Sequence, residues 1–274
     1  RADGATRMTT QSRPAPANVA ILGCGRSGTS IFGELFEAIP GYTYYSEPFL
    51  ADVPFPASGP IAVKVPRTAA GSSPPTGASV SLDDLRSVLP DPMIFWQVRH
   101  PLDAICSLRV GIAQDWAHHP RPPDWQDWIE RPLVERCAHH WATINGAGYA
   151  LVRGEAVVNR FEDMIRDPVT CAVTTCRRVG GDASAPELAA WADRVQDTNN
   201  EQFVEAVTSR GHSRPDHDRR VDRWRDNLSP ADVDASAPTR SPPPWRGPRR
   251  LRRRRSFDYV ARPGRCGRTA PGPA

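Results

Sequence analysis

The chain has 274 residues, of which 39% are hydrophobic and 24% are charged, a balance typical of a globular protein. No apolar run approaches the roughly 20 residues that a membrane-spanning helix needs, and the N-terminal segment contains no apolar stretch typical of a secretory signal. The six cysteines include no CxxC pair, which argues against a zinc site or a disulfide framework. We therefore expect a cytoplasmic protein with no membrane span and no metal.

The positive charge is concentrated at the C-terminal end. The formal net charge is +4, but residues 235–274 hold eleven arginines and one acidic residue, a charge of +10 that leaves −6 for residues 1–234. This segment is also rich in proline and glycine and has no hydrophobic periodicity, so it cannot build a core. We interpret it as a disordered tail or as the product of a reading-frame shift. Nucleic-acid binding through this tail is an alternative function, whereas none is expected for the rest of the chain.

The first part of the chain reads as a flexible leader followed by alternating strands and helices. Residues 1–17 form the leader, and an apolar run at 18–23 predicts a buried strand before a helix at 28–39. Strand patterns follow at 42–45 and 61–65, separated by a proline-rich loop at 48–59.

The second part of the chain continues the alternation. Ser81, with Asp84 three residues on, caps a short helix, and the apolar run 93–98 has the composition of a buried parallel strand. Pro101 suits the first position of the next helix. Further helices are expected within 124–150, at 167–179 and at 186–195, with a strand at 156–161. The pattern predicts one α/β domain over residues 18–234 with a mainly parallel sheet.

The loop "GCGRSGTS" at 23–30 fits two phosphate-binding patterns incompletely. Gly23 and Gly28 have the glycine spacing of a Walker A loop, but the lysine of GxxxxGK[ST] is absent, which argues against ATP or GTP cleavage. Gly23, Gly25 and Gly28 also match the dinucleotide fingerprint GxGxxG, and Glu47 lies 19 residues beyond the last glycine. An NAD(P)-dependent oxidoreductase is therefore an alternative function.

Hydroxyl and guanidinium groups favour a terminal phosphate over a dinucleotide. Arg26, Ser27, Thr29 and Ser30 make the loop richer in such groups than a pyrophosphate held on backbone alone requires. A second anion site is indicated by "RHPLDAICS", in which Arg99 ends a strand and Ser107 follows eight residues later in the next helix. Both would lie at the carboxyl edge of the sheet, where α/β proteins bind ligands.

Four segments in order resemble the sulfotransferases that use 3′-phosphoadenosine 5′-phosphosulfate (PAPS). "GCGRSGTS" and "RHPLDAICS" are similar to the family's 5′-phosphosulfate and 3′-phosphate loops. "NRFEDMIRDP" and "RWRDNLSPADV" resemble two further family segments, the second of which closes over the 3′-phosphate. "YYSEPF" resembles the carbohydrate and bacterial branch. The resemblance covers about residues 18–233, and the arginine-rich tail departs from it.

The resemblance implies a P-loop-like, three-layer fold with a central parallel sheet flanked by helices. It also implies sulfuryl transfer from PAPS to a hydroxyl of a carbohydrate, glycolipid or secondary metabolite. Glu47 would act as the general base, unless it is a loop carboxylate paired with an arginine. Lys64 would face the reacting groups, unless it is a solvent-exposed strand-end residue. The residues implied for the 5′-phosphosulfate are Arg26, Ser27, Gly28, Thr29 and Ser30; those implied for the 3′-phosphate are Arg99, Ser107 and Arg223.

Several other residues are weaker candidates. Arg67 shares the strand-end position of Lys64. Histidines can act as bases but are more often structural in such contexts; those considered are His100, His139 and His140. Tryptophans of the middle region would form core or the wall of the acceptor site; they are Trp116, Trp125, Trp128 and Trp141. The proline-rich loop "HHPRPPDW" is a candidate lid.

Overall fold

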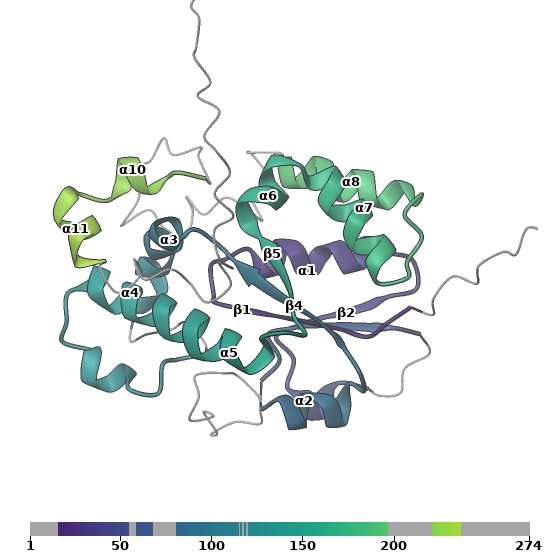
Figure 1. Cartoon of the computed structure of the whole chain (residues 1–274), viewed down its shortest axis with the longest axis horizontal. Helices are drawn as coiled ribbons and strands as arrows, with labels where there is room; N and C mark the ends of the chain where they lie inside the picture. The colour runs from purple at the N-terminus through teal and green to yellow at the C-terminus, as the bar shows by residue number, and fades with distance from the viewer. Residues whose placement is uncertain are drawn as a thin grey trace, which may run out of the picture.

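The computed structural model describes residues 16–54, 59–67, 81–114, 116, 118, 120–196 and 221–236. Residues 1–15 of the predicted leader (1–17) and residues 237–274 of the predicted tail (235–274) lie outside the described residues. The centre of the molecule is a five-stranded parallel sheet of order β2-β3-β1-β4-β5 (Figure 1). The strands are β1 (Val19–Gly23), β2 (Thr43–Ser46), β3 (Ile61–Lys64), β4 (Met93–Val98) and β5 (Val157–Arg160). The predicted parallel α/β architecture is confirmed.

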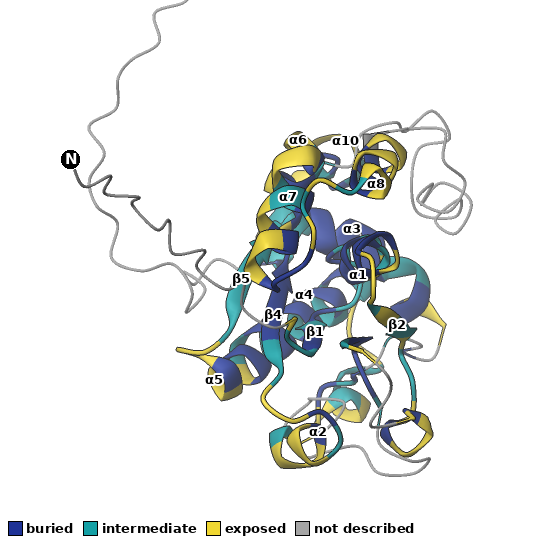
Figure 2. Ribbon diagram, turned by 90° about the vertical axis from the view of Figure 1, so that its right-hand side faces the viewer, coloured by how far each residue is buried: buried dark blue, intermediate teal, exposed yellow. Residues whose placement is uncertain are grey.

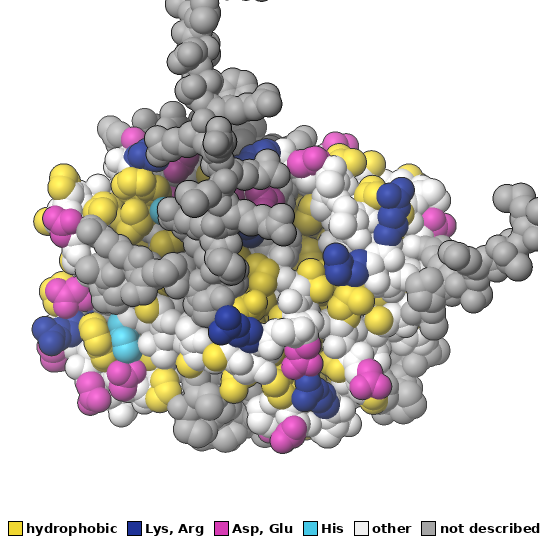
Figure 3. Space-filling model, in the orientation of Figure 1, with side chains coloured by type: hydrophobic (Ala, Val, Ile, Leu, Met, Phe, Trp, Pro, Cys, Tyr) yellow, Lys and Arg dark blue, Asp and Glu magenta, His cyan; other side chains and the backbone are white. Residues whose placement is uncertain are grey.

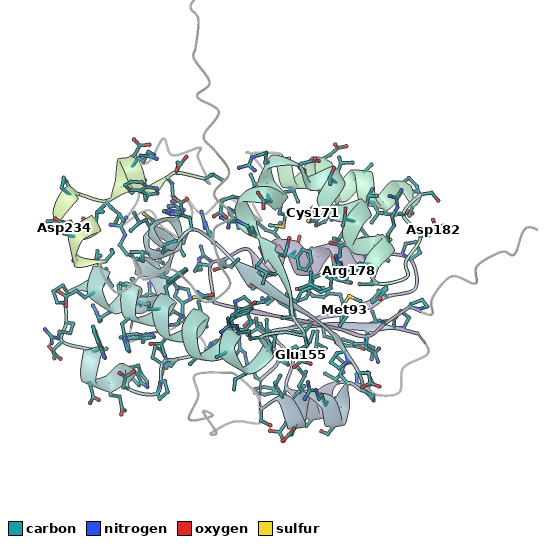
Figure 4. All side chains as sticks on the ribbon, in the orientation of Figure 1. Met93, Glu155, Cys171, Arg178, Asp182 and Asp234 are labelled. Carbon is teal, nitrogen blue, oxygen red and sulfur yellow. The ribbon has the colours of Figure 1, made fainter. Side chains whose placement is uncertain are left out.

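The central strands are apolar on both faces, as expected for parallel strands covered by helices on both sides. In β1, Val19 and Ile21 face one core cluster, whereas Ala20 faces another. The register aligns the strand ends: Gly23 of β1 pairs with Gln97 of β4. The loops that leave these strands therefore emerge at one carboxyl edge, on the side of α3 and α10 (Figure 1). Figure 4 places Met93, at the amino end of β4, away from that edge.

Helices cover both faces of the sheet and give the predicted three layers. One face is covered by α1 (Thr29–Ala38), α6 (Phe161–Arg166), α7 (Pro168–Arg178) and α8 (Pro186–Gln196), whose apolar side chains form one core cluster with the sheet. The other face is covered by α2 (Leu82–Val88) and α5 (Tyr149–Val152). In Figure 2 the inward faces of these elements are buried and the outward faces exposed, the amphipathic pattern of surface helices.

A third cluster of apolar side chains joins the helices beside the carboxyl edge. It is built by α3 (Pro101–Ala113), α4 (Leu133–Thr143) and the π-helical turn Ile144–Gly148 that continues α4. The C-terminal helices α10 (Trp224–Asn227) and α11 (Pro230–Ala235) pack on α3 and α4. Short 3₁₀ turns occur at Leu50–Asp52 and Trp125–Trp128.

Helix ends follow the local signals in the sequence. Ser81 Oγ accepts the N–H of Asp84 at 3.0 Å, and Pro101 occupies the first turn of α3, as predicted. Ser229 and Asp232 form a capping box at α11, and Asp167 caps α7. The predicted strand at 156–161 ends one residue early because Phe161 begins α6, a helix that the sequence pattern did not indicate.

Two expected absences can be examined only within the described part of the chain. There, no helix is both long enough and apolar enough to span a membrane. The same residues contain no group of three or more histidine, cysteine, aspartate or glutamate side chains arranged to hold a metal. The cysteines within these ranges are free thiols.

Candidate active site

The glycine loop between β1 and α1 is a tight turn that only small residues allow. Gly28 has φ 86 and precedes α1, and a Cβ at this position would collide with the ring of Phe161. A Cβ at Gly23 would collide with the carbonyl oxygen of Gln97 on the neighbouring strand. Arg26 also has a left-handed backbone, with φ 64, which is uncommon for a residue with a side chain and is concentrated at functional sites.

The N-terminus of α1 is suited to an anion. Its first turn contains no acidic residue, and no side chain caps it, so its backbone N–H groups and dipole remain available. Ser27 is fully buried beside it, and its Oγ has no hydrogen-bond partner among the described residues. Thr29 is buried as well, whereas Ser30 points to the neighbouring strand end. The loop thus presents hydroxyl and N–H donors together.

A second cluster brings two arginines to one hydroxyl. Arg99, which follows β4, donates from Nη1 to Ser107 Oγ on α3 at 3.1 Å. Arg223 donates to the same oxygen at 3.3 Å, from a segment 116 residues away in the chain. The Nη1 of Arg99 also donates to the carbonyl oxygen of Arg26 at 3.1 Å, which joins this cluster to the glycine loop. Arg99 and Arg223 are 3% and 1% exposed.

Three cationic side chains, those of Arg26, Arg99 and Arg223, lie near one another here, and two of them, Arg99 and Arg223, are buried. Burial, followed by the charge of Arg99, lowers the pKa of Arg223 to about 10. The same two causes lower the pKa of Arg26. Burial also lowers the pKa of Arg99, although the carboxylates of Asp103 and Glu162 oppose this effect. Two buried guanidinium groups beside a third that is partly exposed favour a ligand with more than one negative charge.

Two residues of the segment 159–168 contact Arg99 and the turn that follows it. The guanidinium of Arg99 lies over the ring of Phe161, 4.3 Å from its centroid. Glu162 accepts the backbone N–H of His100 at 2.6 Å and thereby fixes the turn that leads from β4 into α3. Sequence reasoning assigned neither residue a role, although both lie in the segment "NRFEDMIRDP" that carried the family resemblance.

Glu47 lies between two cations at the ends of β2 and β3. Its Oε1 is 2.7 Å from Lys64 Nζ, and its Oε2 accepts from Arg67. Lys64 also donates to Ser30 Oγ at 3.0 Å, so it links Glu47 to the first turn of α1. Lys64 is 3% exposed, and the alternative prediction that it points into solvent is wrong. Glu47 has φ 53, a second left-handed residue at this edge.

These contacts fix the charge of Glu47. Burial raises the pKa of its carboxyl group, but the hydrogen bonds and charges of Lys64 and Arg67 outweigh burial and bring the pKa below its ordinary value of 4.5. Glu47 is therefore ionised at neutral pH. Its side chain is 39% exposed, so a molecule in solvent can reach it.

The histidines considered as bases within the middle region make structural contacts. His140 is buried, and its Nδ1 accepts from Trp116 Nε1 at 2.9 Å. His139 lies 2.8 Å from Asp124 and stacks on Trp128 with ring centroids 4.0 Å apart. The contacts of His139 hold the segment around Trp128 against α4.

The remaining aromatic candidates divide between core and support. Trp116 and Trp141 are 0% and 3% exposed and belong to the core, one of the two predicted roles. Trp125 packs at the margin of the same cluster. His100 stacks on Trp224 with centroids 6.2 Å apart, which joins the turn after β4 to α10. The candidate lid at 118–125 is described only in part, so its role remains a prediction.

The strand order separates this fold from the dinucleotide-binding one. In the dinucleotide-binding fold the order is 3-2-1-4-5-6, whereas here β3 lies between β1 and β2. The GxGxxG sequence therefore follows the first strand of a sheet with a different strand order. In this sheet β2 and β3 lie on one side of β1, whereas β4 and β5 lie on the other. The glycine loop and Arg99 leave these two adjacent strands, at the point where such sheets bind ligands.

Comparison with known proteins adds a structural likeness. No family model and no curated protein matches the sequence. Among solved structures, mouse sulfotransferase SULT7A1 complexed with PAP is 15% identical with a TM-score of 0.50, covering 82% of this chain and 84% of that one. A sulfotransferase from Alicyclobacillus acidocaldarius is 17% identical with a TM-score of 0.36, covering 72% and 96%. From the first of these likenesses, the chain has the P-loop-like α/β fold of a sulfotransferase.

Proposed function

We propose that this protein is a sulfotransferase that moves a sulfuryl group from PAPS to a hydroxyl group. The observation that supports this most is the pair of buried arginines, Arg99 and Arg223, that donate to Ser107. Arg99 also donates to the carbonyl oxygen of Arg26, which joins the pair to the loop before a helix N-terminus that lacks a cap. Two anion sites at one sheet edge suit a nucleotide with phosphate groups at both its 3′ and 5′ positions. The shared fold with a mouse sulfotransferase solved with PAP, the desulfated donor 3′-phosphoadenosine 5′-phosphate, adds support.

The residues present fit such a donor. The buried hydroxyl of Ser27 and the N–H groups from Gly28 to Ser30 would hold the 5′-phosphosulfate. Arg99, Ser107 and Arg223 would hold the 3′-phosphate, whose charge offsets their mutual repulsion. When bound, PAPS supplies an activated sulfuryl group and a nucleotide that departs with its 5′-phosphate.

The chain's own groups act on charge at the reaction centre. Negative charge builds on the departing phosphate oxygen during in-line transfer, and the dipole of α1 and the guanidinium of Arg26 would stabilise it. Lys64 Nζ, held between Ser30 and Glu47, places a further positive charge at the same edge. No metal is required for these roles.

Glu47 would act as the general base. A hydroxyl group is a weak nucleophile at neutral pH, and a carboxylate that removes its proton accelerates attack. Because Lys64 and Arg67 keep Glu47 ionised, a carboxylate oxygen is ready to accept that proton. The acceptor would be a hydroxyl of a carbohydrate, glycolipid or secondary metabolite. We also propose that the enzyme is cytoplasmic and that it belongs to the carbohydrate and bacterial branch of the family.

Calorimetric titration of the full chain with PAP tests this proposal. We expect micromolar or tighter binding that Arg99→Ala abolishes and that the matched variant Arg86→Ala leaves unchanged. Arg86 is a suitable control because it lies on α2, on the face of the sheet opposite α1, and pairs there with Glu155. Titrations with NAD and NADP run in parallel. Binding of either of these in place of PAP would overturn the proposal, and so would PAP binding that is indifferent to Arg99.

The tail-based alternative concerns residues outside the described part of the chain. On the face shown in Figure 3, the described Lys and Arg side chains are dispersed among acidic and apolar ones. Two arginines of the site, Arg99 and Arg223, are buried and donate to Ser107. Deletion of residues 237–274 separates the two functions: nucleic-acid binding would be lost with the tail, whereas PAP binding would stay.

A further inference from the structure

We infer that Asp103 is a positioning residue of the nucleotide site, which acts by holding the segment that carries Arg223. This inference rests on the proposed function, because that function identifies the anion beside Arg223 as the 3′-phosphate. Asp103 lies in the first turn of α3 and is 1% exposed. A buried carboxylate is costly unless its oxygens are satisfied, so its hydrogen bonds show what it does.

Both oxygens of Asp103 bind the C-terminal segment. Oδ2 accepts the backbone N–H of Asp222 at 2.9 Å, and Oδ1 accepts the backbone N–H of Trp224 at 3.0 Å. The two N–H groups belong to the residues on either side of Arg223, so the carboxylate brackets that arginine. Asp222 has φ 63, a left-handed conformation that the bracket helps to hold.

The geometry of α3 explains why this bracket matters for the site. Asp103 and Ser107 are four residues apart in one helix and therefore lie on the same face. Asp103 fixes the backbone around Arg223, and Ser107 accepts from the tip of the same side chain at 3.3 Å. One face of α3 thus holds both the backbone around Arg223 and its guanidinium group, and Ser107 on that face also contacts Arg99.

Docking of Arg223 is opposed by its neighbours. It is 1% exposed, and burial and the charges of Arg99 and Arg26 all disfavour its charged form. The negative charge of Asp103 acts in the opposite direction. The two charge-assisted hydrogen bonds that Asp103 accepts from backbone N–H groups therefore help to keep the cationic Arg223 in a place that burial and neighbouring positive charges disfavour.

Two explanations of Asp103 predict opposite effects of Asp103→Asn on PAP affinity. If Asp103 only contributes charge, its neutralisation removes a negative charge near the phosphate, and PAP would bind more tightly. If Asp103 positions Arg223, the amide keeps one acceptor oxygen and loses the other, Arg223 is no longer held, and PAP would bind more weakly. The sign of the change therefore distinguishes the explanations.

The experiment measures PAP and adenosine 5′-phosphate binding to the full chain by calorimetry. We expect Asp103→Asn to weaken PAP binding about tenfold or more, and adenosine 5′-phosphate, which has no 3′-phosphate, to be unaffected. In an Arg223→Met background the same substitution should have no further effect on PAP. Asp83→Asn is the matched control, because Asp83 also lies in the first turn of a helix but is exposed, on α2 on the opposite face of the sheet from α1.

A second variant covers the case in which Asp103→Asn does not fold. Asp103→Glu keeps the charge but moves the carboxylate. If Asp103 positions Arg223, this variant should bind PAP more weakly, whereas if Asp103 acts only through its charge, PAP affinity should stay unchanged. Failure of the wild-type chain to bind PAP would overturn the proposed function itself. Wild-type binding with PAP affinity unchanged or increased in both variants would overturn the role of Asp103 alone. The role of Asp103 would also be overturned if Asp103→Asn weakened PAP binding equally in the wild-type and Arg223→Met backgrounds. The same conclusion would follow if it weakened the binding of PAP and of adenosine 5′-phosphate equally.

Discussion

Lys64 and Glu47 form an ion pair of 2.7 Å in which the lysine is buried and the carboxylate is accessible. The pair joins neighbouring strands, because Ser46 at the end of β2 is the register partner of Lys64 at the end of β3. The ammonium group of Lys64 is shielded from solvent, and its other described hydrogen bond goes to Ser30. Glu47 therefore has two roles to test: it stabilises a buried cation, and it offers an ionised oxygen to a ligand.

Substitution of Glu47 by glutamine should separate chemistry from donor binding. The amide cannot accept a proton from the acceptor hydroxyl, so we expect kcat to fall about 10²–10⁴-fold. Affinity for PAP should change little, because Arg99, Ser107 and Arg223 remain. Transfer of labelled sulfate to an acceptor found by screening measures the first quantity, and calorimetry measures the second. Glu155→Gln, an exposed residue on the far side of the sheet, should leave both unchanged; an equally active Glu47→Gln enzyme would remove Glu47 as the base.

Arg67→Gln should shift the acid limb of the pH–rate profile upward. Arg67 lowers the pKa of Glu47 through a hydrogen bond and through its charge, and a neutral residue removes the charge. The base must be deprotonated, so activity declines as pH falls through its pKa, and a higher pKa moves that decline to higher pH. Profiles of kcat/KM for the two enzymes make the comparison. An acid limb at the same pH in both would mean that Glu47 does not control it.

The same ion pairs should make stability depend on pH. The folded-state pKa of Glu47 is depressed, so its contribution is present above the ordinary value of 4.5 and is lost as pH falls through the lower folded value. Glu47→Gln should lower the free energy of unfolding by about 1–2 kcal/mol at pH 7, because the buried ammonium of Lys64 loses its charged partner while solvent screens part of the effect at the exposed carboxylate. Urea denaturation at pH 7 and at several values below 4.5 should show this difference narrowing. A difference that widens on acidification would contradict the assignment.

Ser107→Ala should weaken PAP binding without a loss of charge. The Oγ accepts from both Arg99 and Arg223, and its removal leaves two buried guanidinium groups less well held. We expect an affinity loss of about tenfold, from one to two hydrogen bonds to charged groups. Calorimetry with PAP measures it, and Ser87→Ala on α2, whose hydroxyl bonds only locally in the described structure, is the control. Equal affinities for Ser107→Ala and wild type would place the 3′-phosphate elsewhere.

Local signals predicted the elements, and long-range contacts account for what they missed. The strand at 93–98 and the helix from Pro101 follow from an apolar run and a proline, which act within a few residues. Lys64 was ambiguous because β3 is buried on both faces, so its sequence has no alternation to show where a side chain points. Glu162 and Asp103 were missed because their partners lie 62 to 121 residues away, beyond any local pattern.

The distribution of the site along the chain has a consequence for how the protein folds. Its parts come from the first strand, the fourth strand and a segment around Arg223, and they are joined by hydrogen bonds that span 73, 116 and 121 residues. Such non-local contacts form late, since the chain must close large loops before they give any stabilisation. A chain still being synthesised can pair β1 with β4 long before Arg223 has been added. The proposed nucleotide site should therefore be completed only after the sheet has formed.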